Sequence, residues 1–425
     1  MEITAAAIAS IVALVIVVII SCVNEDLNVG FLSIGFAIIV GGLWANTSGA
    51  KVMGYFPVSL FMILAGVTFL FGMAQTNGTM EKFTAYAVRM CGGNAALIPL
   101  MMFVLTTFVT TIGPGNIAGT ALMAPMAMAI AAQVKMPAFL MTLLVVGAAN
   151  GAAFSPFAPT GIIANGIIAK MAPALGITDT NALAWKIHFN STIAQGFVNI
   201  GGFFIMGGWA WINKQRGQAL NIDELAPKPE PFDKHQKLTL VMIFILILLV
   251  VLPGLPMTKA MFPKSIKLLL ANVGSVAFML SCVLMLTGSG DSKKAVNVMP
   301  WGVMMMVCGV TVLIEVMDKS GGLNALVKVI GSISTPTTIN GWLGFITGLI
   351  SAYSSSSGVV MPMFLPMTPG LIQEVGGCNP ISIISSINIG AHLVDTSPLS
   401  TLGALCIACA GAHEDKNVLF RKLLI

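Results

Sequence analysis

Four short polar segments interrupt otherwise apolar stretches of this chain, and they contain residue types that bind small ions and anions. They are residues 113–116, 155–161, 354–358 and 395–401. Hydroxyl, amide and carboxylate oxygens are hard ligands that suit small cations. A helix that breaks inside a membrane also leaves free carbonyls for a cation and free N–H groups, with a partial positive charge, for an anion. The four segments therefore predict a combined site for a cation and a small anion.

The residues of this predicted site fall into two overlapping sets. The anion is assigned to Asn116, Ser155, Pro156, Thr160, Ser356, Ser357, Ser397, Pro398, Ser400 and Thr401. The cation is assigned to Gly115, Asn116, Asn150, Ser355, Ser356, Asp395 and Thr396. The alternative for a Ser or Thr in an apolar helix is a hydrogen bond back to a carbonyl of its own helix. That alternative is favoured for scattered hydroxyls, whereas the clustering in two matching places favours a site.

Two titratable residues accompany the last segment. Asp395 is the main acidic residue within an apolar stretch, and an ionisable side chain at that depth is functional by default, as a Na⁺ ligand or a proton carrier. The alternative is a helix cap on the N–H groups of Thr396 and Ser397. His392, one turn earlier, is interpreted as a packed, hydrogen-bonded histidine in preference to a proton relay.

The composition places the chain in a lipid bilayer. It is 56% hydrophobic and 9% charged, with a mean hydropathy of +0.93. Several apolar runs reach the roughly 20 residues that cross about 30 Å of hydrocarbon. A large soluble enzyme and a nucleic-acid-binding protein are excluded, and the net charge of +5 is interpreted as a topology signal. The seven cysteines are an odd, scattered set that argues against a disulfide framework, and Cys406 and Cys409 are interpreted as small buried hydrophobes.

The two halves of the sequence repeat one another. Pro57, Gly66-Val67-Thr68 and Gly78 recur 243 positions later, as Pro300, Gly309-Val310-Thr311 and Gly321. Ser155-Pro156 with Gly161 recurs as Ser397-Pro398 with Gly403. Membrane transporters are commonly built from two repeats with the substrate held where they meet. The duplication therefore predicts a transporter.

The expected fold is an all-α polytopic membrane protein with two inverted repeats, each containing a re-entrant helical hairpin and a broken transmembrane helix. Glycine and proline mark the hairpin tips and the breaks, and basic residues mark the linker as cytoplasmic. The second repeat has no counterpart to the last span of the first, so either a final crossing helix is missing or the second repeat is shorter. The symmetry favours a missing helix. The first repeat covers residues 1–213 (hairpin 95–133, broken helix 136–171), the linker 214–237, and the second repeat 238–425 (hairpin 339–375, broken helix 381–412).

Paired hairpins and paired broken helices resemble the ion transporter superfamily, which includes the divalent anion:sodium symporters. More narrowly, residues 149–161 and 395–403 resemble the bacterial malonate and dicarboxylate carriers of that superfamily. The symporters carry Ser-Asn-Thr at each hairpin tip, with a proline nine residues after the Asn. The first tip here keeps Asn116 but lacks both hydroxyls, and the second, at Ser357, lacks the Asn and the Thr.

The resemblance implies a secondary transporter of malonate-like or succinate-like dicarboxylates, in the inner membrane of a bacterium. It also implies a homodimer in which each protomer moves its hairpins and broken helices as an elevator, with no cofactor. The polar segments contain no Arg or Lys, so two carboxylates in low dielectric would need a bound cation to offset their charge. Na⁺ is the first choice for that cation, and a proton is the second.

Three alternative functions fit parts of the same pattern. A Na⁺/H⁺ antiporter or an arsenite-type efflux carrier would share the architecture. Antiport usually needs a strong titratable centre, and one Asp with one His provides only a weak one. An intramembrane protease would use Ser357 with His392. The Gly-x-Ser-Gly pattern of such a protease is absent, because position 355 is Ser.

Overall fold

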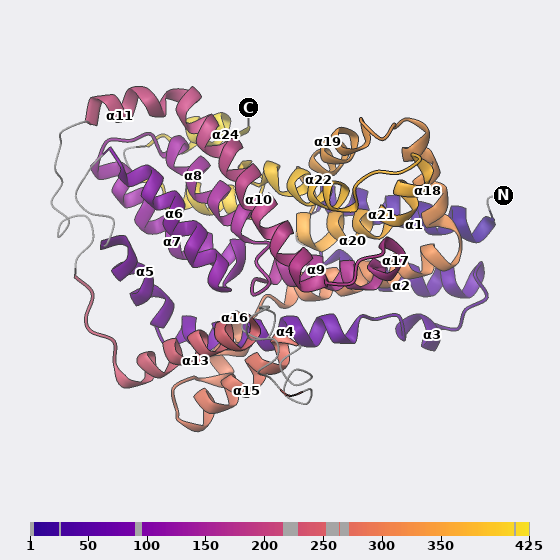
Figure 1. Ribbon diagram of the computed structural model, residues 1–425, viewed down its shortest axis with the longest axis horizontal. Coiled ribbons are helices and arrows are strands. Elements are labelled where there is room, and N and C mark those ends of the chain that lie inside the picture. The colour runs from indigo at the N-terminus through magenta and orange to yellow at the C-terminus, as the bar shows by residue number, and fades with distance from the viewer. Residues whose placement is uncertain are drawn as a thin grey trace. The chain divides into compact units, whose positions relative to one another are not determined.

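The computed structural model describes residues 4–24, 27–89, 96–215, 228–251, 263, 272–411 and 414–424. Every regular element in these ranges is a helix, so the all-α class is confirmed for them. The chain divides into two compact units. Figure 1 labels the helices and colours them in chain order. Unit 1 contains Met1–Phe61, Ile163–Ile187 and Pro300–Val394, and unit 2 contains Met62–Ile162, His188–Met299 and Asp395–Ile425.

The protein is a multi-pass membrane protein. Five helices of the described ranges are long and apolar enough to cross a bilayer: α1 (Ala5–Val23), α4 (Val58–Thr76), α7 (Gly115–Gln133), the continuous stretch Thr180–Gln215, and α17 (Trp301–Lys319). The long stretch comprises α10 (Thr180–Phe203), the π-helical turn η2 (Phe204–Gly208) and α11 (Trp209–Gln215). On it, Phe197 is 83% exposed and Ile205 87%, an arrangement that suits contact with lipid.

Unit 1 is organised around two helix pairs. α2 (Val29–Leu43) packs against α17, and α19 (Ile339–Ser351) packs against α22 (Pro380–Leu393). Glycine allows the first pair to approach closely, since a Cβ on Gly309 would lie 2.1 Å from the carbonyl oxygen of Gly30. Unit 1 also contains α1, α3 (Gly49–Met53), η1 (Pro173–Leu175), α18 (Gly322–Ser332), η4 (Ser356–Val360), α20 (Met361–Phe364), η5 (Leu365–Met367) and α21 (Thr368–Glu374).

Unit 2 is organised around three helices that pack on one another, namely α6 (Ile98–Ile112), α7 and α8 (Ala138–Ala152). α23 (Thr401–Cys409) lies against α7 and α8. Glycine again permits a close helix pair, since a Cβ on Gly66 of α4 would lie 2.4 Å from the carbonyl oxygen of Gly274. Besides η2 and α11, the helices that also begin in this unit are α5 (Thr79–Arg89), α9 (Pro159–Met171), α13 (Lys234–Val251), α15 (Val273–Leu286), α16 (Ser292–Val298) and α24 (Lys416–Leu424).

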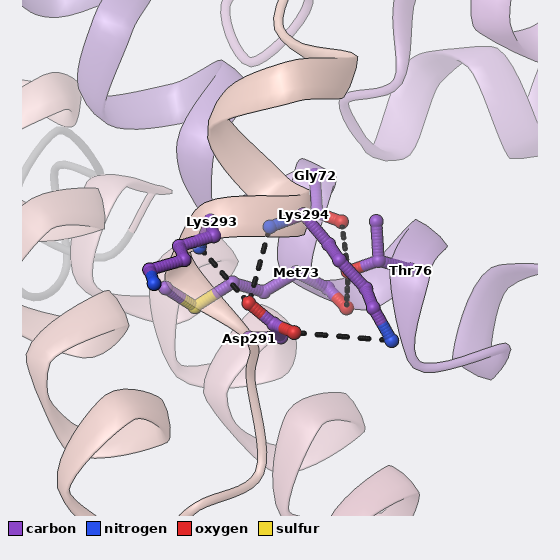
Figure 2. Close-up of polar contacts among 6 residues, drawn as sticks. All are labelled: Gly72, Met73, Thr76, Asp291, Lys293 and Lys294. Carbon is purple, nitrogen blue, oxygen red and sulfur yellow. Dashed lines mark hydrogen bonds and ion pairs between the residues drawn. The ribbon is translucent and has the colours of Figure 1, made fainter.

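Short polar contacts fix helix ends in unit 2, as Figure 2 shows for α16. Asp291 caps this helix by accepting hydrogen bonds from the main-chain N–H groups of Lys293 (3.0 Å) and Lys294 (3.1 Å). The hydrogen bond from Lys294 and the charge of both lysines lower the pKa of the Asp291 carboxyl. Beside it, Thr76 donates to the carbonyl of Gly72, 2.9 Å away, within α4.

The expected segments correspond to the following helices. The stretch 95–133 contains α6 and α7, and 136–171 contains α8 and α9. The stretch 339–375 contains α19 through α21, and 381–412 contains most of α22, the short turn η6 (Val394–Thr396) and α23. Residues 216–227 of the expected linker lie outside the described residues. The small helices α3 and α24 were not expected from the sequence.

The close contact between α2 and α17 gives a first prediction. Gly30→Ala places a Cβ 2.2 Å from the carbonyl oxygen of Met305, so we expect it to lower the stability of the purified protein by about 1–3 kcal/mol. Gly35→Ala on the same helix is the matched control, because a Cβ there meets nothing within 4 Å. Thermal unfolding in detergent measures both variants. Equal midpoints for the two variants would contradict the close packing.

Candidate functional site

The tip between α6 and α7 is a tight turn that needs glycine. Gly113 has φ 149° and Gly115 has φ 84°, in a region that disfavours other residues. A Cβ on Gly113 would also lie 2.1 Å from the ring of Phe71. This turn places Asn116 in the first turn of α7, where the N-terminal end of the helix carries a partial positive charge.

The chain unwinds between α8 and α9. After α8 ends at Ala152, the main-chain N–H of Ala158 donates to Ser155 O (3.0 Å), and that of Gly161 donates back to Ala153 O (2.9 Å). A Cβ on Gly161 would lie only 2.0 Å from Ser155 O, so the chain folds over itself at this point. The break thus sets the position at which α9 begins.

Three contacts join this break to the hairpin tip within unit 2. Asn116 Nδ2 donates to Asn150 Oδ1 over 3.1 Å, and the Ser155 hydroxyl donates to the main-chain oxygen of Thr111 over 2.7 Å. A Cβ on Gly115 would lie 2.8 Å from Cδ of Pro159. The structure therefore brings together Gly115, Asn116, Asn150 and Ser155, four of the residues predicted from the sequence.

The hydroxyl of Ser155 differs from the scattered hydroxyls of the membrane helices. Ser33, Thr68 and Thr142 each donate to a carbonyl four residues earlier in their own helix. Such bonds fit the purely local role expected for scattered hydroxyls. Ser155 instead bonds to the end of a different helix, 44 positions away in sequence.

The polar segment 395–401 lies in unit 2 and precedes α23. Asp395 is buried, with 6% of its surface exposed. The Ser400 hydroxyl donates to the main-chain oxygen of Asp395 and accepts from the N–H of Gly403 (3.2 Å), which caps α23. The Ser397 hydroxyl accepts a hydrogen bond from the N–H of Leu399 (3.3 Å). The remaining predicted residues of unit 2 are Pro156 in the first break, Thr160 at the start of α9, and Thr396, Pro398 and Thr401 in this segment.

A separate group of predicted residues lies in unit 1, around the turn that precedes η4. The Ser355 hydroxyl caps this turn by accepting from the N–H of Gly358 (3.0 Å). Ser351 donates to the hydroxyl of Ser356 over 2.6 Å. The hydroxyl of Ser357 lies 3.1 Å from Nε2 of His392 on α22. His392 is thus hydrogen-bonded, as the sequence interpretation expected, but its partner is one of the predicted site residues.

Sequence reasoning missed a buried polar face on α10. His188, Ser191, Gln195 and Asn199 recur at intervals of three or four residues and are all at most 5% exposed. This face packs on α8, because a Cβ on Gly147 would lie 2.2 Å from Cγ of Asn199. Thr192, on the same part of α10, donates to the main-chain oxygen of Gly151 (3.1 Å). The helical spacing of these polar residues in an apolar span was the available signal.

The donor atoms of these segments suit an alkali cation better than a transition metal. Among the described residues, no group of three or more His, Cys, Asp or Glu side chains is placed to hold a metal ion. The atoms that gather in unit 2 are amide, hydroxyl and carbonyl oxygens together with the N-terminal end of α7. Such an arrangement can hold a small cation and an anion side by side.

Comparison with known protein families matches the first part of the chain. Residues 4–153 match the family model described as dicarboxylate carrier protein MatC N-terminus. This range includes the hairpin tip at Asn116 and its partner Asn150, and it ends just before Ser155. A search of curated proteins finds no match.

The hydrogen bond between Asn116 and Asn150 gives a second prediction. Replacing both residues by Ala should destabilise the protein less than the sum of the two single replacements, with a coupling of about 0.5–1.5 kcal/mol, because either single change already removes the bond. Thermal unfolding of the four proteins measures this coupling. The control pairs Asn116→Ala with Asn417→Ala, which is at an exposed position. The losses of stability caused by these two replacements should add. Additivity in the Asn116–Asn150 cycle would show that the two amides are not coupled.

Proposed function

Because residues 4–153 match the family model of the dicarboxylate carrier protein MatC N-terminus, we propose that this chain is a secondary active transporter of small dicarboxylates such as malonate or succinate. The proposal includes coupling to a cation and alternating access by an elevator motion. The match of residues 4–153 supports the dicarboxylate, and it supports a carrier over an enzyme.

The observation that carries the proposal is the junction of the hairpin tip with the broken helix in unit 2. Here an unwound stretch, a helix N-terminus and the two amides of Asn116 and Asn150 meet in an apolar environment. Free main-chain carbonyls and amide oxygens coordinate Na⁺ in membrane proteins, while helix N-termini bind carboxylates. We assign a Na⁺ to this junction, beside Gly115, Asn116 and Asn150, and a substrate carboxylate to Ser155 and Thr160.

The helix bounds support two repeats. α4 and α17 are both 19 residues long and begin 243 residues apart, and α5 and α18 are both 11 residues long with the same spacing. Asn-Val-Gly at the start of α2 recurs at the start of α15, where Asn28 and Asn272 act as N-caps. The glycine contacts recur as well, with Gly30 against Gly309 and Gly66 against Gly274. We propose that the two repeats are inverted in the membrane, as is common in transporters of this kind.

The polar residues of the two repeats also correspond. The pair Asn116 and Asn150 has its counterpart, 241 and 242 positions later, in Ser357 and His392. Both pairs join a hairpin tip to the helix that precedes a break. The contact of Gly161 with Ser155 O recurs as the contact of Gly403 with Ser397 O, at 2.0 Å and 2.1 Å for a Cβ built on each glycine. This correspondence supports one polar half-site per repeat, where a half-site is the junction of a hairpin tip with the helix that precedes a break. We propose that each half-site serves to bind a cation and an anion.

Asp395 is the one acidic residue among those proposed to bind the substrate or the cation. We propose that it contributes to cation binding together with Thr396, and that Ser356, Ser357, Ser397, Ser400 and Thr401 contribute hydroxyls to the substrate. Since dicarboxylates carry two negative charges, burying them in this arrangement would be costly without a bound cation, and this cost supports coupling to a cation. A homodimer in a bacterial inner membrane is the assembly that the resemblance to the dicarboxylate carriers supports.

The hydrogen bond between Ser357 and His392 favours one alternative function, a hydrolase with a Ser–His pair. An oxyanion hole would need free main-chain N–H groups beside the nucleophile. Here the N–H of Gly358 is bound by the Ser355 hydroxyl, and those of Val359 and Val360 donate to Ser355 O. His392 Nδ1 lies beside a main-chain carbonyl instead of the carboxylate of a catalytic triad. These contacts favour transport over hydrolysis.

Uptake into proteoliposomes tests the proposed function. We expect radiolabelled malonate and succinate to accumulate in vesicles that contain the purified chain when an inward Na⁺ gradient is applied, and to accumulate less without it. Proteoliposomes with an inward proton gradient separate the two candidate cations. Absence of dicarboxylate uptake under both gradients, together with Na⁺-driven proton movement, would favour the antiporter alternative.

Two substitutions provide the third prediction. Asn116→Ala and Asp395→Asn should each lower the rate of malonate uptake by at least about tenfold, the effect of losing about 1.4 kcal/mol of binding, without loss of expression. Asn417→Ala and Asp179→Asn, both at exposed positions, are the matched controls and should transport at the wild-type rate. Wild-type uptake by the Asn116 and Asp395 variants would refute the assignment of the site.

A further inference from the structure

The two corresponding polar pairs differ in one chemical respect. Asn116 and Asn150 are both neutral amides that do not titrate, whereas the counterpart of Asn150 is the imidazole of His392. His392 has no exposed surface, and its Nε2 lies 3.1 Å from the Ser357 hydroxyl. One of the two half-sites therefore contains a group that can bind and release a proton.

The contacts of the imidazole assign its hydrogen atoms. Nδ1 lies 3.0 Å from the main-chain oxygen of Asn388, and because a carbonyl can only accept, Nδ1 must carry a hydrogen. In the neutral imidazole Nε2 is then the acceptor, and the Ser357 hydroxyl donates to it. When Nε2 gains a proton it becomes a donor to the oxygen of Ser357, and the hydrogen of that hydroxyl is released to donate elsewhere.

A second observation points to a ligand at the same place. Asn388 lies one turn before His392 on α22, and its side chain has no exposed surface. Neither Oδ1 nor Nδ2 of Asn388 has a hydrogen-bond partner in the described part of the chain. A buried amide with both polar atoms unpaired is rare in folded proteins. It is explained when a ligand or a bound water supplies the missing hydrogen-bond partners. Residues at i and i+4 share one face of a helix, so Asn388 and His392 present their polar groups on the same side of α22.

Few charges surround this position. Of the helices that pack against α22 in unit 1, α19, η4 and α20 contain no charged residue, and α21 contains only Glu374, which is exposed at its far end. α17, which packs against η4, carries a Glu315–Lys319 ion pair (3.0 Å) near its C-terminal end. The other titratable groups on these elements or next to them in sequence are Cys308 and Asp318 on α17, exposed Tyr353 before η4, Cys378 before α22, and Asp395 three residues after His392.

An imidazolium in this environment needs an anion to offset its charge. We propose that His392 is a proton-binding site, in which one proton at Nε2 accompanies each dicarboxylate, with Ser357 and Asn388 as polar partners. The inference rests on the proposed transport function and adds a second coupling ion to it. The proton comes from the solution on the side where the substrate binds and returns to the solution on the side where the substrate leaves. Only the N–H bond at Nε2 forms and breaks.

Proton binding and substrate binding then promote one another, because linkage between two ligands is reciprocal. The protonated imidazole attracts the anion, and the reversed hydrogen bond releases the Ser357 hydroxyl to donate to a carboxylate oxygen. The half-site of the first repeat, with two amides, takes part in no such exchange. The two repeats of the transporter would thus use different cations at corresponding positions.

Calorimetric titration of the purified full chain with malonate tests this inference. Measurements in two buffers of different ionisation enthalpy report the binding constant and the number of protons taken up on binding. We expect proton uptake by the wild type and its loss in His392→Asn, the residue type found at the corresponding position 150. His235→Asn is the matched control, because His235 also bonds a serine hydroxyl, that of Ser289 (2.9 Å), but is exposed at the start of α13. This control should keep the wild-type proton uptake.

The outcomes separate the inference from the proposed function. If the wild type binds neither malonate nor succinate, the proposed function fails, and this inference fails with it. If His392→Asn binds malonate with undiminished proton uptake, the inference alone is overturned. If His392→Asn does not bind malonate, Ser357→Ala decides, since it keeps the imidazole but removes its hydroxyl partner. The pH at which proton uptake is half-maximal should then shift, and an unchanged pH would overturn the inference.

Discussion

The constraint on which this structure depends is that main-chain polar groups have no water to bind inside a bilayer. A helix can therefore unwind there only if protein groups take the place of its lost hydrogen bonds. The break after α8 meets this requirement through the turn from Gly161 to Ala153 and through the bond of Ser155 to the end of α6. The hydrogen bonds that replace those lost at the break also hold it against the hairpin tip. The contacts that stabilise the fold therefore also form the candidate site.

Much of the fold follows from the sequence because membrane helices and their interruptions have strong signals. Apolar length predicted the spans, and glycine with proline marked the tip at residues 113–116 and the break after Ala152. The small helices α3 and α24 were missed, since each is short and carries no long apolar run. The close pairing of Gly30 with Gly309 could not be predicted, because two glycines far apart in sequence give no sign that they meet.

The polar residues of the candidate site were proposed from the sequence, but their pairing could not be predicted. Asn116 and Asn150 lie in separate helices, and only the fold shows that one donates to the other. His392 was interpreted as a packed, hydrogen-bonded histidine in preference to a proton relay, and its partner could not be named from the sequence. Its bond to Ser357 becomes informative only beside the corresponding amide pair, since the same position holds a neutral group in one proposed repeat and a titratable group in the other. The polar face of α10 was overlooked for a related reason, because its members are scattered among apolar residues.

The central claim is that this chain exchanges dicarboxylates across a membrane, and a counterflow measurement tests it without assuming any coupling ion. Proteoliposomes that contain the purified protein are loaded with unlabelled malonate and diluted into a trace of labelled malonate. The account predicts that label accumulates transiently inside loaded vesicles and not inside vesicles loaded with a monocarboxylate such as acetate. Equal label in both sets of vesicles would contradict the claim.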